Sequence, residues 1–152
     1  MIIAVCVDDR MGMLFNHRRQ SRDKFVIDDL MNIAEKVKIN GFSEELFEDY
    51  KERIEVDENF LENAESEDIC FVDNIDLEPY ADKIDKVILY LWNRHYPSSL
   101  KFKVDLSDYN FIEETEFAGN SHEKITREVY SKWKNWYFAW YLVYVWFSGA
   151  VR

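Results

Sequence analysis

Three short apolar runs, separated by longer and more polar stretches, limit the folds open to this chain most strongly. The runs are IIAVCV at residues 2–7, ICFV at 69–72 and KVILYLW at 86–92. A run that is apolar on both faces is typical of a strand covered on both sides, as inside an α/β sheet. Residues 86–92 give the strongest strand signal, and we expect them to lie in the interior of the sheet.

Helical patterns fill the space between the first two runs. Ser21 is a possible N-cap, and apolar residues then recur at helical spacing, at Phe25, Val26, Leu30, Ile33, Ala34 and Val37. Asn40-Gly41 offers a left-handed stop. A second helix is predicted over 43–53, where acidic residues come first and basic residues last, as the helix dipole favours. Two shorter helical segments are predicted at 57–64 and 77–85.

The C-terminal part changes character. Residues 100–106 and 109–117 alternate apolar and polar side chains, which predicts antiparallel strands at the edge of the sheet. Residues 122–130 fit either a strand or a helix, because the apolar positions from Ile125 onward match both periods. Strands that first alternate with helices and later follow one another predict an α/β fold: a mixed sheet flanked by helices, with an antiparallel C-terminal hairpin.

Charge is distributed unevenly along the 152 residues. The net charge is −11, and residues 25–82 alone carry four Lys or Arg against nineteen Asp or Glu, which is −15. Nucleic-acid binding depends on cationic side chains that displace counterions from phosphates. We therefore expect no nucleic-acid partner, and we interpret the acidic block as solvated helix faces rather than a mimic of nucleic acid.

The sequence carries few signs of secretion. Cys6 and Cys70 both lie in apolar runs, which favours buried thiols in a reducing compartment over a disulfide. No charged segment followed by an apolar one opens the sequence. We expect a cytoplasmic protein with a single α/β domain at 1–132.

In its order of elements the chain resembles dihydrofolate reductase over about residues 1–130. IIAVCVDDRMGMLFN resembles the first strand and mobile loop of that family, and RDKFVIDDL resembles its first helix. PYADKIDKVILYLWNRHYP is similar to a later helix, strand and turn, and VDLSDYNFIEETEFAGNSHEKITREVY to the closing hairpin. The resemblance implies a dihydrofolate reductase-like fold with Asp23 as the acid that binds a pterin ring and assists its protonation.

The sequence also departs from that family. The Pro-Trp that follows the mobile loop is replaced by the basic HRRQS at 17–21, and the middle of the family is shortened into residues 40–55. The Gly-Gly pair that lets cofactor phosphates approach the backbone is replaced by Asp73-Asn74, which would oppose the pyrophosphate of NADPH. The threonine that supports the catalytic acid aligns with Tyr90. The cofactor is therefore unknown, with NADPH as one candidate.

Each candidate site residue also has a purely structural interpretation. Asp23 as a catalytic acid needs a raised pKa in an apolar cleft, whereas a first-turn aspartate only stabilises the helix dipole. The other ligand-binding candidates are Ala4, Gly12, Asn16, Arg18, Arg19 and Tyr90. The basic cluster could bind a phosphate or carboxylate, or pair with the acidic middle of the chain. Asp8-Asp9 could hold Mg²⁺, but we expect it to face water, and no metal site is predicted from the histidine spacing.

The last twenty residues, 133–152, form an aromatic tail beyond the resemblance. Residues 135–151 are uncharged, and 133–147 hold four of the five tryptophans. A packed or oligomer-forming helix, a membrane contact and an extension without a selected role all remain open.

Three functions follow from these features. The leading hypothesis is an altered-function or non-catalytic relative of dihydrofolate reductase that binds a small ligand or a protein partner. The second is an NAD(P)H-dependent reductase of a pterin-like substrate, with Asp23 as the proton donor. The third is a membrane-peripheral protein attached through residues 133–151.

Overall fold

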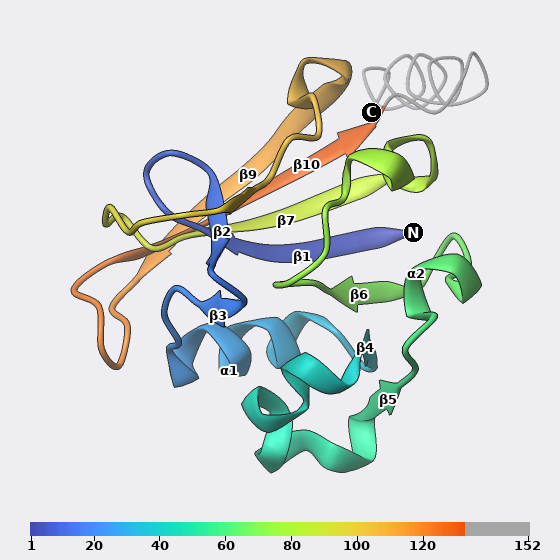
Figure 1. Ribbon diagram of the computed structural model, residues 1–152, viewed down its shortest axis with the longest axis horizontal. Coiled ribbons are helices and arrows are strands. Elements are labelled where there is room, and N and C mark those ends of the chain that lie inside the picture. The colour runs from blue at the N-terminus through green and yellow to red at the C-terminus, as the bar shows by residue number, and fades with distance from the viewer. Residues whose placement is uncertain (133–152) are drawn as a thin grey trace, which may run out of the picture.

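A mixed seven-stranded sheet forms the centre of the computed structural model, which describes residues 1–132 (Figure 1). The strand order is β5-β4-β6-β1-β7-β10-β9. β1 lies parallel to both β6 and β7, while β10 lies antiparallel to β7 and β9. The predicted fold class and the antiparallel C-terminal hairpin are confirmed. The bounds are Ile2–Val7 (β1), Val37–Ile39 (β4), Ile54–Val56 (β5), Ile69–Phe71 (β6), Lys86–Leu91 (β7), Tyr109–Phe117 (β9) and Ile125–Lys132 (β10).

A second, three-stranded sheet packs beside the first. It consists of β3 (Arg18–Arg19), β2 (Gly12–Phe15) and β8 (Leu100–Lys101), in that order. The prediction of a main-sheet strand over 100–106 is therefore wrong. The strand in this segment is confined to Leu100–Lys101, which pair with β2, and Asp105 then caps a short 3₁₀ turn, η3 (Leu106–Asp108).

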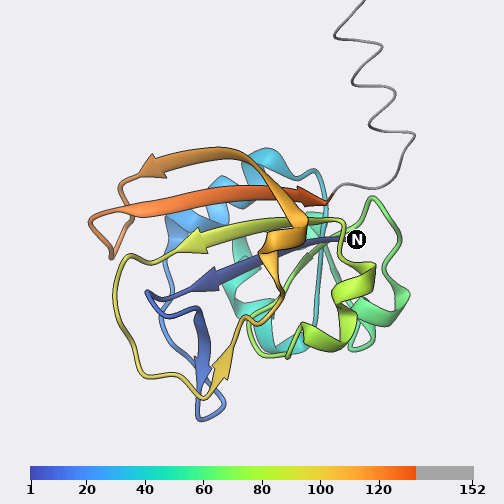
Figure 2. The same ribbon diagram turned by 90° about the horizontal axis from the view of Figure 1, so that it is seen from above.

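Alternate side chains of β1 face two separate hydrophobic cores. Val5 and Val7 pack with α2 (Phe60–Asn63) and the strands of the small sheet, whereas Ala4 and Cys6 pack against α1 (Lys24–Ile33). Figure 2 shows α1 and the arm formed by β2 and β8 on opposite sides of the sheet. Because both faces of β1 are covered, its sequence reads as a continuous apolar run.

The first predicted helix is wrong at both ends. α1 begins at Lys24 with Asp23 as its N-cap and ends at Ile33, so Ser21 is not the cap. Residues 37–39 form β4 instead of a last helical turn, since Val37 and Ile39 are buried and alternate with Lys38. Asn40-Gly41 follows this strand rather than the helix.

The other predicted helical segments exist but are shorter or tighter. Residues 43–53 belong to a kinked 3₁₀ segment, η1 (Gly41–Arg53), and 57–64 contain only the one turn of α2. Residues 77–85 contain the 3₁₀ helix η2 (Glu78–Lys83). The ambiguous segment at 122–130 enters strand β10, because it pairs on both sides with β7 and β9.

Cys6 and Cys70 are both free and buried, as predicted. Burial raises the pKa of the Cys70 thiol to about 11 and that of Cys6 further, so both stay protonated at neutral pH. No helix within residues 1–132 is long and apolar enough to cross a membrane. The predictions for the tail, 133–152, lie outside the described residues.

Candidate functional site

A cleft opens where the parallel strands end. Asn40 follows β4, Asp73 lies two residues beyond β6, and Trp92 follows β7. Ligands of open α/β sheets bind at this edge. The deeper part, here called the inner pocket, is lined by residues that include Cys6, Arg19, Ser21, Asp23, Asp73 and Trp92. Its volume is about 20 Å³, enough for one water molecule, which needs roughly 10–15 Å³.

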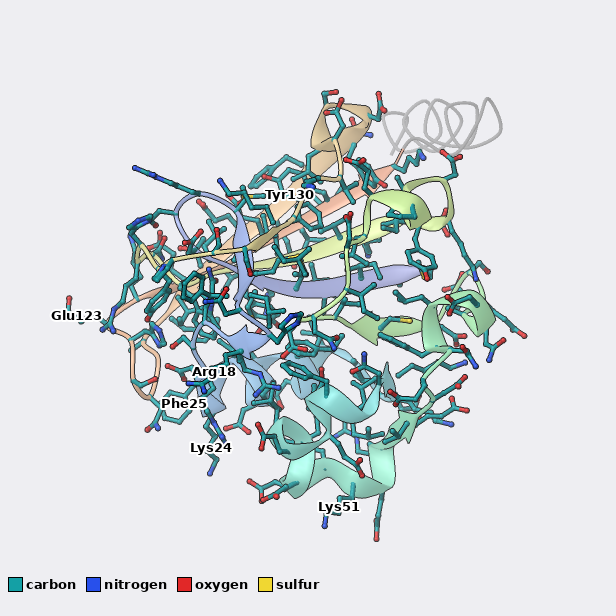
Figure 3. The ribbon with its side chains drawn as sticks, in the orientation of Figure 1. Arg18, Lys24, Phe25, Lys51, Glu123 and Tyr130 are labelled. Carbon is teal, nitrogen blue, oxygen red and sulfur yellow. The ribbon has the colours of Figure 1, made fainter. Side chains whose placement is uncertain are left out.

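A wider space, here called the mouth, adjoins the inner pocket. Its volume is about 350 Å³. Arg22, Asp23, Ile27 and Leu46 line both spaces, and the polar side chains that line only the mouth are Lys24, Glu45, Glu48, Asp49, Asn120 and Ser121. Figure 3 shows Lys24 and Phe25 at the start of α1 and Glu123 in the β9–β10 turn. The mouth therefore lies between the start of α1, the first half of η1 and that turn.

Asp23 is the most heavily bonded side chain of the cleft. Only 4% of the residue is exposed, and its side chain is fully buried. It caps α1 by accepting the Phe25 N–H at 3.0 Å. It also accepts the backbone N–H groups of Asn120 at 2.8 Å and Ser121 at 2.9 Å, and the Nδ1–H of His122 at 2.9 Å. The carboxylate thus joins α1 to the β9–β10 turn.

These bonds determine the protonation of Asp23. Burial alone would raise its pKa, but the hydrogen bonds from Asn120, Ser121, His122 and Phe25 lower the pKa to about 2. The carboxyl is therefore ionised at neutral pH. A proton donor would need the opposite shift.

His122 extends the network into the inner pocket. Its ring is buried and stacks on Trp92, with the ring centroids 4.6 Å apart and an interplanar angle of 20°. Because the Asp23 carboxylate only accepts, Nδ1 carries the hydrogen, and Nε2 is left to face two hydroxyl groups. The Oγ of Ser21 lies 3.1 Å from Nε2 and the Oη of Tyr96 lies 3.0 Å from it.

Sequence reasoning missed this group. It found no metal site in the histidine spacing, and it interpreted Ser21 as a helix cap and Trp92 and Tyr96 as parts of a strand and a turn. Apart from the adjacent Ser121, the hydrogen-bond partners of the His122 ring lie 26 to 101 residues away along the chain, so no local spacing could have indicated them.

Gly119 lets the turn approach Asp23 closely. Its N–H donates to the His122 carbonyl at 2.9 Å and closes the turn. A Cβ at this position would lie 2.5 Å from the Asp23 Oδ2 and 2.8 Å from the His122 carbonyl oxygen, closer than side chains tolerate. The absence of a side chain at Gly119 is thus a condition for the Asp23–His122 bond.

Arg19 and Asp73 form a second polar group on the cleft wall. The Arg19 Nε donates to the Asp73 Oδ2 at 2.7 Å, and the Ser43 Oγ donates to the Asp73 Oδ1 at 2.7 Å. The guanidinium also reaches Glu45 at 2.8 Å and the Phe42 carbonyl at 2.9 Å. Asp73 is 3% exposed, so its charge is buried with the charge of Arg19.

The neighbouring Asn74 is tied across the same edge. Its side-chain oxygen accepts the Asn40 Nδ2–H at 2.9 Å. Asn74 is thus bonded to Asn40, between β4 and η1, while Asp73 is bonded to Ser43, within η1.

Tyr90 does not support Asp23. Tyr90 is a buried residue of β7, and its hydroxyl donates to the Asp29 Oδ2 at 2.7 Å. Asp29 is in turn held by the Arg127 Nη1, at 2.8 and 2.7 Å to its two oxygens. Tyr90 and Ala4 are both fully buried in the core beneath α1, so neither has the exposure that a ligand contact needs.

The first turn is organised by Asp8, against our expectation that this residue faces water. Its carboxylate is 2% exposed and accepts the backbone N–H groups of Arg10, Gly12 and Tyr96 at 2.7–3.0 Å. Burial raises the pKa of Asp8, but these bonds lower it more. Asp8 thus places the Tyr96 backbone near the cleft. Within residues 1–132, no three acidic, histidine or cysteine side chains are grouped to hold a metal ion.

The remaining predicted site residues belong to the β2–β3 hairpin. Asn16 is exposed at its tip and Arg18 is exposed beside it, whereas Arg19 points into the cleft wall. A Cβ at Gly12 would lie 2.6 Å from the side chains of Gln20 and Ser98. Of the predicted site residues, all in the described part of the chain, Asp23 and Arg19 line the inner pocket.

The likeness to known proteins is one of structure. The chain is similar to dihydrofolate reductase from Enterococcus faecalis, which was solved in complex with NADP(H) and RAB-propyl. The TM-score is 0.60 at 8% sequence identity, over 88% of this chain and 97% of that one. No protein-family model and no curated protein matches the sequence. The fold is therefore dihydrofolate reductase-like.

Proposed function

We propose that this chain, with its dihydrofolate reductase-like fold, binds a small neutral or cationic molecule in the cleft beside Asp23 and does not act as an NADPH-dependent reductase. The observation that carries the proposal is the ion pair between the partly exposed Arg19 and the buried Asp73. It lies where the resembled family exposes glycine backbone to cofactor phosphates.

A pyrophosphate does not fit these residues. A phosphate needs backbone N–H groups or free cations, but this edge presents the Asp73 carboxylate, and the Arg19 guanidinium beside it is already bonded to Asp73 and Glu45. Freeing Arg19 would leave the Asp73 charge buried without its partner, which costs several kcal/mol. The Asn40–Asn74 bond covers the next position along the same edge.

The charge of the mouth supports the same ligand class. Asp23, Glu45, Glu48 and Asp49 line it together with two cations, Arg22 and Lys24. Four negative and two positive charges leave −2. Such a mouth repels polyanions such as dinucleotides and favours neutral or positively charged molecules.

One observation supports the alternative function, reduction of a pterin-like substrate, and this is the dihydrofolate reductase-like fold. Against it stands the ionised state of Asp23, which holds no proton to donate near neutral pH. The alternative would therefore need both a new cofactor position and a new acid.

Ligand titrations separate the two functions. The purified chain would be titrated with NADPH, NADH, folate and methotrexate while its thermal midpoint is followed, beside an authentic dihydrofolate reductase as the positive control. Binding at a hundredfold excess over Kd would add about 2.7 kcal/mol of stability. We expect no shift with either dinucleotide. Saturable micromolar binding of NADPH would overturn the proposal and favour the reductase.

The role of the tail at 133–152 stays a prediction. A chain truncated after Lys132 would be compared with the full chain by analytical ultracentrifugation and by flotation with anionic vesicles. Loss of self-association or of vesicle binding would assign the tail to an oligomer contact or to a membrane contact, respectively.

A further inference from the structure

Asp23, His122 and Ser21 lie in the order carboxylate, imidazole, hydroxyl. The His122 Nδ1 donates to the Asp23 Oδ2 at 2.9 Å, and the Ser21 Oγ lies 3.1 Å from Nε2 on the opposite side of the ring. The Tyr96 hydroxyl donates to the Ser21 Oγ at 3.4 Å. A nucleophile within hydrogen-bond reach of a base, which is itself oriented by a third group, is the geometry of acyl transfer through serine.

We propose that Ser21 is a nucleophile, with His122 as its general base and Asp23 as the residue that positions the imidazole, and that the cleft hydrolyses small esters. This inference rests on the proposed function in one respect, since it takes the substrate to be a neutral or cationic molecule bound in the same cleft.

Each member of the group is held in place by the fold. The stacking of His122 on Trp92 fixes the plane of the ring, and the bond to Asp23 fixes its tautomer, so that Nε2 is free to accept a proton. Asp23 is itself fixed by the two N–H groups of the turn and by its capping bond. Ser21 lies on the wall of the inner pocket, next to Arg22, which also lines the mouth.

The sizes of the inner pocket and the mouth limit which esters can bind. The inner pocket, at about 20 Å³, has room for little more than one water molecule, so a substrate can extend no more than a very short acyl group into it. The mouth, at about 350 Å³, has room for the alcohol part of an ester. Its net negative charge disfavours an anionic alcohol. The class is therefore an ester of a formyl- or acetyl-sized acid with a neutral or cationic alcohol.

The reaction then proceeds in two halves. The Ser21 Oγ forms a bond to the carbonyl carbon while its proton passes to the His122 Nε2, and the negative charge moves to the carbonyl oxygen. The bond to the alcohol breaks and the alcohol leaves with that proton. Water next attacks the acyl-Ser21 and gives a proton to Nε2, which is returned to Oγ as the acid leaves. The sum is ester plus water giving acid plus alcohol.

Two probes test the proposal on the full chain. A fluorophosphonate should label the protein by forming a bond between Oγ and phosphorus with loss of fluoride, and tandem mass spectrometry should place the adduct on Ser21. The chain should also hydrolyse p-nitrophenyl acetate much faster than p-nitrophenyl octanoate. Ser21→Ala should abolish the labelling and lower the acetate rate by at least about 100-fold.

The controls separate chemistry from folding. Ser66→Ala, which removes an exposed hydroxyl between α2 and β6, should change neither readout. The thermal midpoint of Ser21→Ala should stay close to that of the parent. His122→Gln should lose the labelling. Equal labelling of Ser21→Ala and the parent, an adduct on Tyr96, or no labelling above heat-denatured protein would each overturn the proposal. None of these results would alter the outcome of the NADPH titration.

Discussion

The His122 Nδ1 donates to the Asp23 Oδ2 at 2.9 Å, although the two residues lie 99 positions apart in the sequence. Asp23 caps α1 and His122 lies in the turn between β9 and β10. One hydrogen bond therefore joins the first helix to the C-terminal hairpin across the cleft. Changes at this contact should affect both the stability of the fold and the chemistry of the site.

Asp23→Asn should reduce stability in a pH-dependent way. The folded-state pKa of Asp23 is about 2, against about 4 in an unfolded chain. Because the folded-state pKa is depressed, the ionised carboxylate adds about 2 kcal/mol to the free energy of unfolding. This stabilisation is fully present above about pH 4 and is lost as the pH falls toward 2. Urea unfolding at pH 7 and at pH 3 should show a larger loss for Asp23→Asn at the higher pH. Asp9→Asn, at an exposed position, is the matched control. An equal loss at both pH values would contradict this explanation.

Gly119→Ala should be destabilising by about 1–3 kcal/mol, because the new methyl group would overlap the Asp23 carboxylate and the His122 carbonyl. The measurement is the urea midpoint. Gly41→Ala is the matched control, since a Cβ there meets only the flexible end of Glu58, at 3.2 Å. If the two substitutions cost the same, the close approach of the turn to Asp23 is not what requires glycine.

Arg19→Gln should cost about 2–3 kcal/mol, because it leaves the buried Asp73 carboxylate without its cation. Arg18→Gln, one position earlier and exposed, should change stability by less than about 0.5 kcal/mol. Adding Asp73→Asn to Arg19→Gln should recover part of the loss, since the unpaired charge is then removed. Purely additive losses would show that the two side chains do not interact.

The strands that sequence predicts best are those covered on both faces. Residues 2–7 and 86–91 form β1 and β7, because burial on two sides leaves a continuous apolar run that local reading detects. The strand β4 was not predicted, because Val37 continues the helical spacing of the preceding residues. Its strand conformation depends on pairing with Cys70 and Ile54, which are distant in the sequence.

The site was less predictable for the same reason. Asp23 was identified through the resemblance to dihydrofolate reductase, but its low pKa comes largely from N–H groups nearly a hundred residues later. The charge of Arg19 was noted as part of a basic cluster, whereas its partner Asp73 follows a different strand. Local patterns can indicate which residues are polar, but not which of them meet.

Tyr90→Phe should lower stability without changing ester hydrolysis. The hydroxyl donates to Asp29, whose carboxylate keeps its two bonds from Arg127 when the hydroxyl is lost, so the expected cost is about 1–2 kcal/mol. Tyr90 lies in the core beneath α1, away from Ser21 and His122. The urea midpoint and the rate with p-nitrophenyl acetate would be measured on the same preparation. A fall in rate larger than the loss of folded protein would place Tyr90 in the site after all.

His17→Gly should stabilise the chain, because the tip of the β2–β3 hairpin is a two-residue turn with both residues left-handed. Asn16 has φ 48° and His17 has φ 63°, and Phe15 pairs with Arg18 across the turn. This conformation favours Asn-Gly, since a side chain at the second position costs about 1 kcal/mol. Glycine loses part of that gain through the greater freedom of the unfolded chain, so the expected net gain is about 0.5 kcal/mol in the free energy of unfolding. His17→Ala keeps the Cβ and should give no such gain, and equal stability of the two variants would show that backbone strain at the tip is relieved in some other way.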